Sequence, residues 1–342
     1  MSLLPSWQRL AAAGLVLLVA LGLPFVATGF QTLELSYALI FAIAILGLNI
    51  LTGFSGQISL GHGAFIAIGA FVMAIGVHLY DINYLATIPV AGVICGVLGF
   101  AIGVPALRLE GIYLALATFA LGVATPNIIK KPTSITGGVK GIILPPVTSP
   151  LPDQVSDEQF FYFVCLLIAA VLFFLAWSIL RGRTGRAWRA IRDGELAATS
   201  FGINIASYKT LAFAVSAAYA GVAGALYGIA TGFVSADAYP FQLSIALLVG
   251  AIIGGIASLE GAIIGGLLSE FLPIYSQQLL FPISKQLANA APGATQGVLL
   301  LIIMFLARDG IAGLLRSGYL RLRLRLTREP LPVDTKQPPP AV

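Results

Sequence analysis

The chain has 342 residues, of which 58% are hydrophobic and only 10% are charged, and its mean hydropathy is +0.96. Soluble domains carry roughly 25% charged residues, so this composition excludes a soluble globular protein and predicts an all-α, polytopic membrane protein. The formal net charge of +5 does not indicate nucleic-acid binding, because the basic residues stand at the ends of apolar runs and no nucleic-acid motif accompanies them.

Runs of about twenty apolar residues form helices about 30 Å long, enough to cross the hydrocarbon core of a bilayer. About ten such runs are present, and we expect each to form a membrane-spanning helix. They cover residues 10–30, 34–52, 61–80, 85–106, 111–129, 160–180, 208–232, 240–257, 260–280 and 295–315. The first run resembles a signal peptide, but its length and the lack of a clean cleavage site favour an uncleaved first span.

The basic residues orient these spans. With Arg9 in the cytoplasm, ten spans place the arginine-rich stretch 181–192 and the basic stretch 316–328 inside. The outer side receives only Lys130, Lys131, Lys140 and Lys285. This asymmetry follows the positive-inside rule, so we expect both termini to be cytoplasmic.

These assignments divide the chain into a transmembrane domain and a tail. We expect the transmembrane domain to cover residues 1–315, with a cytoplasmic loop at 181–209 and an outer loop at 130–159. The outer loop is rich in proline and glycine and lacks helical periodicity. Residues 316–342 form a cytoplasmic tail that is first basic and then proline-rich, and its basic part is typical of an anchor on anionic lipid.

A polar break separates the second and third spans, in the stretch LNILTGFSGQISLGHGAFIAIGA at 48–70. Non-helical backbone is tolerated at membrane depth only where it is buried in protein or lines water. The polar residues of this stretch are therefore candidates for a solute path, namely Asn49, Gln57, Ser59 and His62. A short cytoplasmic turn over 53–61 explains the same pattern equally well.

Glu270 is a further candidate for the solute path, because it is the ionisable residue near the middle of a predicted span. Pro273 follows it and interrupts the helical hydrogen bonds. The carboxyl group either lines a path for a polar solute or is buried and stabilises a kink.

Catalytic motifs are absent from the sequence. It contains no G-x-x-x-x-G-K-[ST] phosphate loop, no H-E-x-x-H and no G-x-S-x-G,. With two histidines, and two cysteines that form no C-x-x-C, neither a metal cluster nor a disulfide framework is indicated. We therefore expect no enzymatic activity, no catalytic residues, no metal and no cofactor.

The stretch GRTGRAWRAIRDGELAATSFG at 182–202 concentrates positive charge in an otherwise apolar chain. We expect two short helices here, one from Gly185 to Arg192 and a second that Asp193 caps and Gly202 ends. Their alanines would form a smooth face and their arginines a charged rim, which suits docking of a soluble partner. Charge alone indicates no more than a stop-transfer anchor.

The pattern E-L-A-A-x-x-x-G from Glu195 to Gly202 resembles the E-A-A…G loop of ATP-binding-cassette (ABC) importer permeases. Four blocks widen the resemblance to the branched-chain amino acid ABC transporter permease family, specifically its LivM-type subunit. They are LGLNILTGFSGQISLGHGAFIAIGA, TSITGGVKGI, GRAWRAIRDGELAATSFGINIASYKTLAF and LLVGAIIGGIASLEGAIIGG. The usual G-G-x-G-S-L of the family reads G-G-I-A-S-L from Gly254 here, which is a small departure.

The resemblance implies a subunit of an ATP-driven importer in a bacterial inner membrane. Its solutes are branched-chain or other hydrophobic amino acids, whereas close relatives carry urea or short amides. Its partners are two ABC ATPase subunits, a second related permease and an extracytoplasmic solute-binding protein. The residues implied to couple to the ATPase are Arg186, Arg189, Arg192, Glu195, Ala197, Ala198 and Gly202. From a different class, a stand-alone channel or ion-coupled carrier predicts transport by this chain alone.

Overall fold

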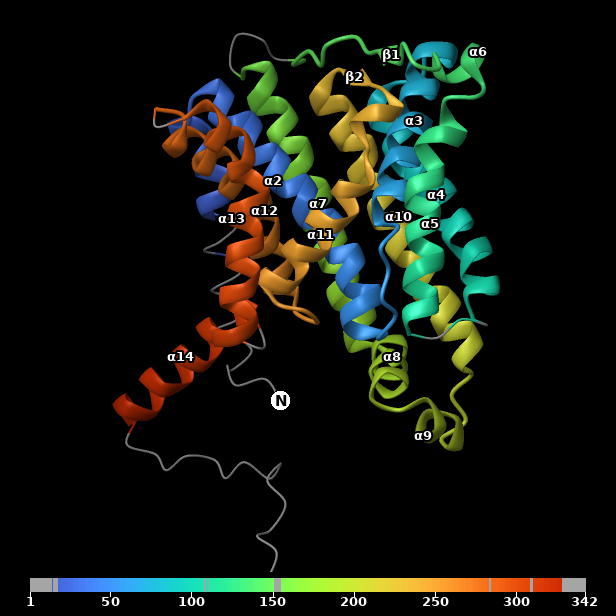
Figure 1. Ribbon diagram of the computed structural model, residues 1–342, viewed down its shortest axis with the longest axis vertical. Helices are drawn as coiled ribbons and strands as arrows, with labels where there is room; N and C mark the ends of the chain where they lie inside the picture. Colours follow the sequence, from blue (N-terminus) through green and yellow to red (C-terminus); the bar gives the residue numbers. More distant parts are fainter. Residues whose placement is uncertain are drawn as a thin grey trace, which may run out of the picture.

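The structure is a computed structural model that describes residues 14, 18–107, 109, 111–150, 155–282, 284–307 and 310–327. It is an α-helical bundle with one two-stranded antiparallel ribbon (Figure 1). The long helices are α2 (Gly29–Leu48), α3 (His62–Tyr80), α4 (Tyr84–Ala106), α5 (Ile112–Ile129), α7 (Asp157–Arg181), α10 (Ile205–Thr231), α11 (Phe241–Gly254), α12 (Leu259–Leu280), α13 (Lys285–Leu306) and α14 (Gly310–Thr327).

Shorter elements join these helices. They are η1 (Asn49–Phe54), α6 (Thr133–Thr136), β1 (Ile142–Ile143), α8 (Arg183–Asp193), α9 (Glu195–Ser200), β2 (Phe233–Val234) and η2 (Ala236–Ala238). In the ribbon, Ile142 pairs with Val234 and Ile143 with Phe233. The described part of the expected outer loop 130–159 contains one short helix and one short strand, and its last three residues belong to α7 (Asp157–Arg181).

Seven helices of the described chain are long and apolar enough to cross a membrane. The pair α13–α14, which is bent by 45°, brings this number to eight. Helix α12 has 22 residues but is less apolar, because Glu260, Glu270 and two glutamines interrupt it. An all-α protein with seven or eight candidate membrane-spanning helices among the described residues is therefore confirmed. Of the expected first span 10–30, the structure describes residue 14 and residues 18–30. Residues 18–26 are helical, and Gly29 already begins α2.

The largest differences between predicted and observed helix boundaries have local reasons. Helix α2 begins at Gly29 rather than at residue 34, because Thr28 and Gln31 form a capping box in which each side chain accepts from the other's backbone N–H,. The predicted span 295–315 is two helices, of which α13 begins ten residues earlier and ends at Leu306. The basic part of the predicted tail is helical as far as Thr327, and 328–342 lies outside the described residues.

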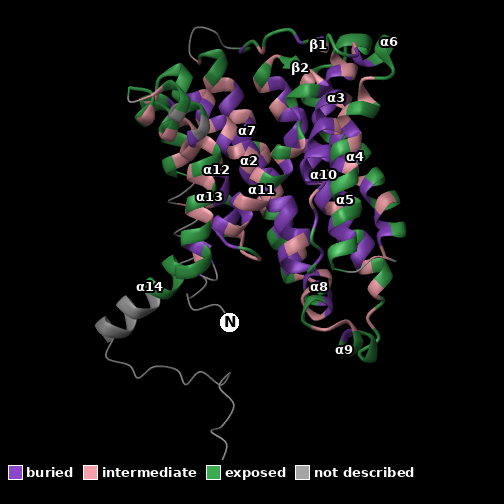
Figure 2. Ribbon diagram, in the orientation of Figure 1, coloured by how far each residue is buried: buried purple, intermediate pink, exposed green. Residues whose placement is uncertain are grey.

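Helices α10 and α2 form the centre of the bundle, and α3, α4, α7 and α12 pack around them (Figures 1 and 2). In the most apolar 18-residue stretch of α10, 78% of the residues are buried. In the corresponding stretches of α5 and α7, 28% are buried. The peripheral helices instead expose large apolar side chains such as Val93, Leu116 and Leu167. An exposed apolar surface of this extent requires lipid or another membrane subunit to cover it.

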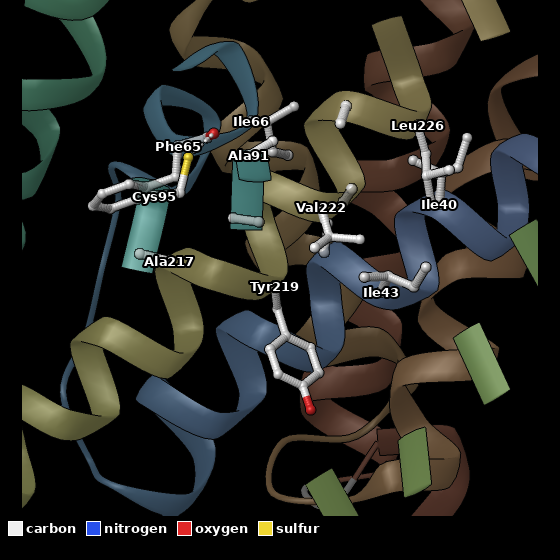
Figure 3. Close-up of a cluster of buried hydrophobic side chains, with 14 of the residues drawn as sticks. Ile40, Ile43, Phe65, Ile66, Ala91, Cys95, Ala217, Tyr219, Val222 and Leu226 are labelled. Atoms are coloured by element: carbon white, nitrogen blue, oxygen red, sulfur yellow. Dashed lines mark hydrogen bonds between the residues drawn. The ribbon is translucent and has the colours of Figure 1, made fainter. Parts of the chain in front are cut away.

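Figure 3 shows the core where α10 meets α2, α3 and α4, with Ile43, Cys95, Ala217 and Leu226 among the buried side chains. Small residues make this close contact possible. A Cβ at Gly224 of α10 would overlap the carbonyl oxygen of Ile66 in α3, so the two backbones touch at this point.

The bundle has two structurally different ends (Figure 1). Helices α8 and α9 lie at one end, which we term the arginine end. Helix α6 and the β1–β2 ribbon lie at the opposite end, which we term the ribbon end. There Lys130 forms a salt bridge of 2.5 Å with Asp237, which ties the loop after α5 to the segment before α11.

Candidate functional site

The α8–α9 loop is anchored through the apolar face of the amphipathic helix α8. Gly185, Ala187, Trp188 and Ile191 are buried on this face, whereas Arg186 and Arg192 are exposed. The indole N–H of the fully buried Trp188 donates to the carbonyl oxygen of Tyr208 at 2.8 Å. This bond joins α8 to the first turn of α10.

The arginines of α8 bond to backbone carbonyls of neighbouring elements. Arg189 donates to the carbonyl of Leu180 at 3.0 Å, near the end of α7, and so satisfies a carbonyl without a partner inside that helix. Arg192 donates to the carbonyl of Gly53 at 2.9 Å. The arginine-rich stretch is therefore part of the folded bundle rather than only a charged flank.

Helix α9 begins and ends at glycines. Its N-cap is Gly194, with no side-chain cap, so the predicted cap by Asp193 is wrong: that carboxylate instead accepts from Arg192 at 3.1 and 3.2 Å. The predicted stop at Gly202 is confirmed, since φ is +75° there. Gly202 N–H donates to Thr199 and Ile203 N–H to Ala198, which is a Schellman motif.

An ion pair fixes α9 to α10. The Nζ atom of Lys209 lies 2.5 Å from Oε1 of Glu195, and the lysine side chain is only 10% exposed. The backbone carbonyl of Lys209 also accepts from Gln57 at 3.2 Å, and Gln57 donates to Ser55 at 2.7 Å. Lys209 therefore joins α9, α10 and the polar segment after η1.

The outer surface of α9 is apolar. Leu196 is 89% exposed and Phe201 is 86% exposed, although both are large hydrophobic residues. Ala197 is also exposed, whereas Ala198 is buried against the bundle. The predicted smooth alanine face is therefore divided: one alanine packs inward, and the outward surface is formed by two bulky side chains.

The polar break after α2 consists of a turn and an extended re-entrant segment. Helix α2 continues through the π-helix η1 to Phe54, the chain turns beside Arg192, and residues 56–61 then run back into the bundle (Figure 1). Leu60 N–H donates to the side chain of Thr118, inside α5, at 2.9 Å. The stretch therefore contains a turn, and it also contains buried non-helical backbone. The choice between a solute path and a short cytoplasmic turn stays open.

Three predicted path residues are bonded within this region. Asn49 donates to the carbonyls of Gly255 and Ser258, and the Ser59 hydroxyl accepts from Gly61 N–H at 3.4 Å. The ring Nε2 of His62 lies 2.9 Å from the hydroxyl of Ser216 in α10. All three side chains are buried. Asn49 and His62 bond to distant parts of the chain, whereas the Ser59 bond is local, so the geometry favours a structural role for them.

Glu270 lies elsewhere, so the structure does not bring the five predicted path residues together. It stands eleven residues along α12 from Leu259, about 16 Å from the contacts of Asn49. Its electrostatic neighbours are Tyr37, Tyr227 and Glu34. Glu34 is 6% exposed and was not singled out from the sequence, because it starts the predicted span 34–52. Glu34 and Tyr37 are three residues apart in the sequence, and this spacing alone would have placed both on one face of a helix.

Comparison with known proteins adds a second line of information. Residues 33–308 match the family described as "Branched-chain amino acid transport system / permease component". This range contains the α8–α9 loop, the re-entrant segment, Glu34 and Glu270. No solved structure matches the chain.

Individual relatives agree with the family match. The high-affinity branched-chain amino acid transport system permease protein LivM of Salmonella typhimurium is 33% identical over 288 residues, covering 78% of this chain and 67% of the relative. LivM of Escherichia coli strain K12 has the same identity and coverage. The permease protein LivH of Salmonella typhimurium is 27% identical over 297 residues, covering 82% of this chain and 92% of the relative.

Proposed function

This chain belongs to the family of permease components of branched-chain amino acid transport systems, and we propose that it imports branched-chain or other hydrophobic amino acids. Components of this family have no catalytic activity of their own. ATP hydrolysis then belongs to two separate ABC ATPase subunits, and solute capture to an extracytoplasmic binding protein. The similarity of the chain to both LivM and LivH supports pairing with a second, related permease.

The observation that carries the proposal is the exposed apolar surface of α9. Leu196 and Phe201 project from a loop that Trp188, Arg189 and Lys209 fix to the bundle. A large apolar side chain that is almost fully exposed at the end of a rigid element is typical of a docking contact. We assign this surface to a groove of the ATPase, with Arg186 at its charged rim.

The proposed topology places the arginine end in the cytoplasm. Ten spans, with the first at 10–30, keep both termini inside and form a transmembrane domain over 1–315, followed by the tail 316–342. The separation of the α8–α9 loop and the loop 130–159 to opposite ends of the bundle supports this arrangement. Lys130 and the exposed Val139 and Ile143 then face the binding protein outside a bacterial inner membrane.

Apolar-to-acidic substitutions on α9 test the function. We expect Leu196→Asp and Phe201→Asp to abolish ATPase co-purification and ATP-driven leucine uptake by the reconstituted complex, because each would place a carboxylate in a hydrophobic contact. Ser200→Asp, in an exposed position of the same helix, is the matched control.

Two results would contradict the proposal. One is normal leucine uptake and ATPase binding by both Asp variants. The other is passage of leucine, without ATP, through liposomes that contain only this chain, which indicates a stand-alone channel or carrier. ATP-driven uptake of urea or a short amide, but not of leucine, would keep the ABC mechanism and change the solute.

A further inference from the structure

Two carboxyl groups lie close together inside the bundle without a cationic partner. Glu34 of α2 is buried and Glu270 of α12 is half-buried. Gly266 of α12 packs against Ala38 of α2, and each glutamate lies one turn from this contact, on the side toward the other. Neither forms a salt bridge with any residue that the structure describes. Acidic side chains at such depth are costly, and they mark sites where a cation or a proton is held.

Three tyrosines surround this acidic pair. Tyr37 and Tyr227 interact electrostatically with Glu270, and their ring centroids are 5.6 Å apart. Tyr239 packs edge-on against Tyr227, at 5.8 Å between ring centroids. These rings come from α2, from α10 and from the segment just before α11, so three separate parts of the chain converge on the two carboxyl groups.

The hydroxyl of Tyr239 is an independent indication of a ligand. Tyr239 is 2% exposed, and its hydroxyl has no hydrogen-bond partner among the described residues. Its ring packs against Tyr227, which in turn packs against Tyr37, so Tyr239 belongs to the same cluster. A buried hydroxyl without a partner is costly, and a polar group of a bound solute would satisfy it.

The cluster lies toward the ribbon end of the bundle. Tyr227 is one turn before the end of α10 at Thr231, and Tyr239 follows β2 and η2 directly. Glu34 is in the second turn of α2, and the start of this helix at Gly29 contacts Glu158 at the start of α7. A solute that enters from the side opposite the α8–α9 loop therefore reaches this cluster first.

We propose that Glu34, Glu270, Tyr37, Tyr227 and Tyr239 form the subsite that holds the ammonium group of the transported amino acid. This inference rests on the proposed function. One positive charge between the two carboxyl groups relieves their repulsion, and the faces of tyrosine rings attract an organic cation. The described residues contain no group of three or more metal-ligating side chains, which favours an organic ammonium over a bound metal ion. Tyr37, Tyr227 and Glu270 are only half-buried, so the subsite stays accessible.

Isosteric substitutions in the complete transporter test this subsite. The complex of both permeases and the ATPases is reconstituted in proteoliposomes, and leucine uptake with saturating binding protein is measured beside ATP hydrolysis. We expect Glu270→Gln and Tyr239→Phe each to lower uptake about tenfold, because a charge-assisted contact to the solute is lost. ATP hydrolysis and co-purification of the ATPase remain at the wild-type level. Glu260→Gln, an exposed carboxylate on the same helix, is the control.

The ratio of transport to ATP turnover identifies the role of the cluster. Hydrolysis that continues while uptake falls in both variants supports a solute subsite, whereas a structural role would lower both activities together. Wild-type uptake by Glu270→Gln and Tyr239→Phe would overturn the inference and leave the proposed function intact. A requirement for Na⁺ that disappears in Glu270→Gln would also overturn it, in favour of an inorganic cation site. Failure of the wild-type complex itself to import leucine would instead refute the proposed function.

Discussion

Charge reversal of Glu195 tests whether the ion pair with Lys209 holds the α8–α9 loop against the bundle. The two charged atoms are 2.5 Å apart, the lysine side chain is 10% exposed and the glutamate side chain 41%. Two unit charges about 4 Å apart interact by about 4 kcal/mol at an effective dielectric constant of about 20. Solvent around the half-exposed Glu195 reduces this energy. We therefore expect Glu195→Lys to destabilise the attached loop by about 2 to 3 kcal/mol.

This energy corresponds to a roughly 30- to 150-fold smaller population of the attached loop. The assay is ATP-driven leucine uptake by the reconstituted complex, together with the amount of ATPase that co-purifies with the permease. Glu195→Lys is expected to lower both strongly. The double reversal Glu195→Lys/Lys209→Glu restores the attraction and is expected to recover most of the lost uptake. The hydrogen bond from Gln57 to the backbone carbonyl of residue 209 does not depend on the side chain and is kept in the double variant.

Two results would refute this reasoning. If Glu195→Lys keeps uptake within twofold of wild type, the pair does not hold the loop. If the single reversal is inactive but the double reversal recovers nothing, then Glu195 acts on the ATPase directly rather than through Lys209. Glu260→Lys is the control, since this carboxylate is exposed and its charge contributes at most about 1 kcal/mol at the start of α12.

Two further predictions concern stability. Trp188→Phe removes the 2.8 Å bond to the carbonyl of Tyr208 and is expected to cost about 1 kcal/mol or more, seen as a lower thermal unfolding temperature of the purified permease; an unchanged temperature would contradict the anchoring role of this indole. Gly224→Ala places a methyl group against the carbonyl of Ile66 and is expected to reduce the yield of folded protein in size-exclusion chromatography, with a cost of about 1 to 3 kcal/mol. Gly293→Ala, where nothing lies within 4 Å, should leave the yield unchanged.

The helices that the sequence predicted best are those whose apolar runs end at strong turn residues. The expected spans 61–80, 85–106 and 111–129 differ by one residue at most from α3, α4 and α5. Asp81 is left-handed at the end of α3, and Asn83 caps α4, so the local sequence determines both boundaries. At the start of α13 the N-cap residue Ser284 forms no side-chain cap, and hydropathy alone placed the boundary ten residues too late.

The candidate sites were predictable only where they depend on local sequence. Gly202 was predicted because an abrupt helix stop favours glycine. Other contacts depend on how the helices pack, and the periodicity of a single sequence does not reveal this packing. Examples are the pairing of Glu195 with Lys209 and the approach of Glu34 to Glu270. The Asp193 cap failed for a related reason: Arg192, directed inward to the carbonyl of Gly53, draws the carboxylate away from α9.

One helix connects the two proposed sites. Helix α10 carries Lys209 at the arginine end and Tyr227 near the ribbon end, eighteen residues apart in a continuous helix, which corresponds to about 27 Å. Between them, Ser216 bonds to His62 at the start of α3, so α3 is attached along the way. Under the proposed mechanism, a displacement of the α8–α9 loop by the ATPase therefore reaches the tyrosine cluster through a rigid element. The burial of α10 among α2, α3 and α4 explains why its motion would shift Tyr227 relative to Glu34, rather than bend the helix itself.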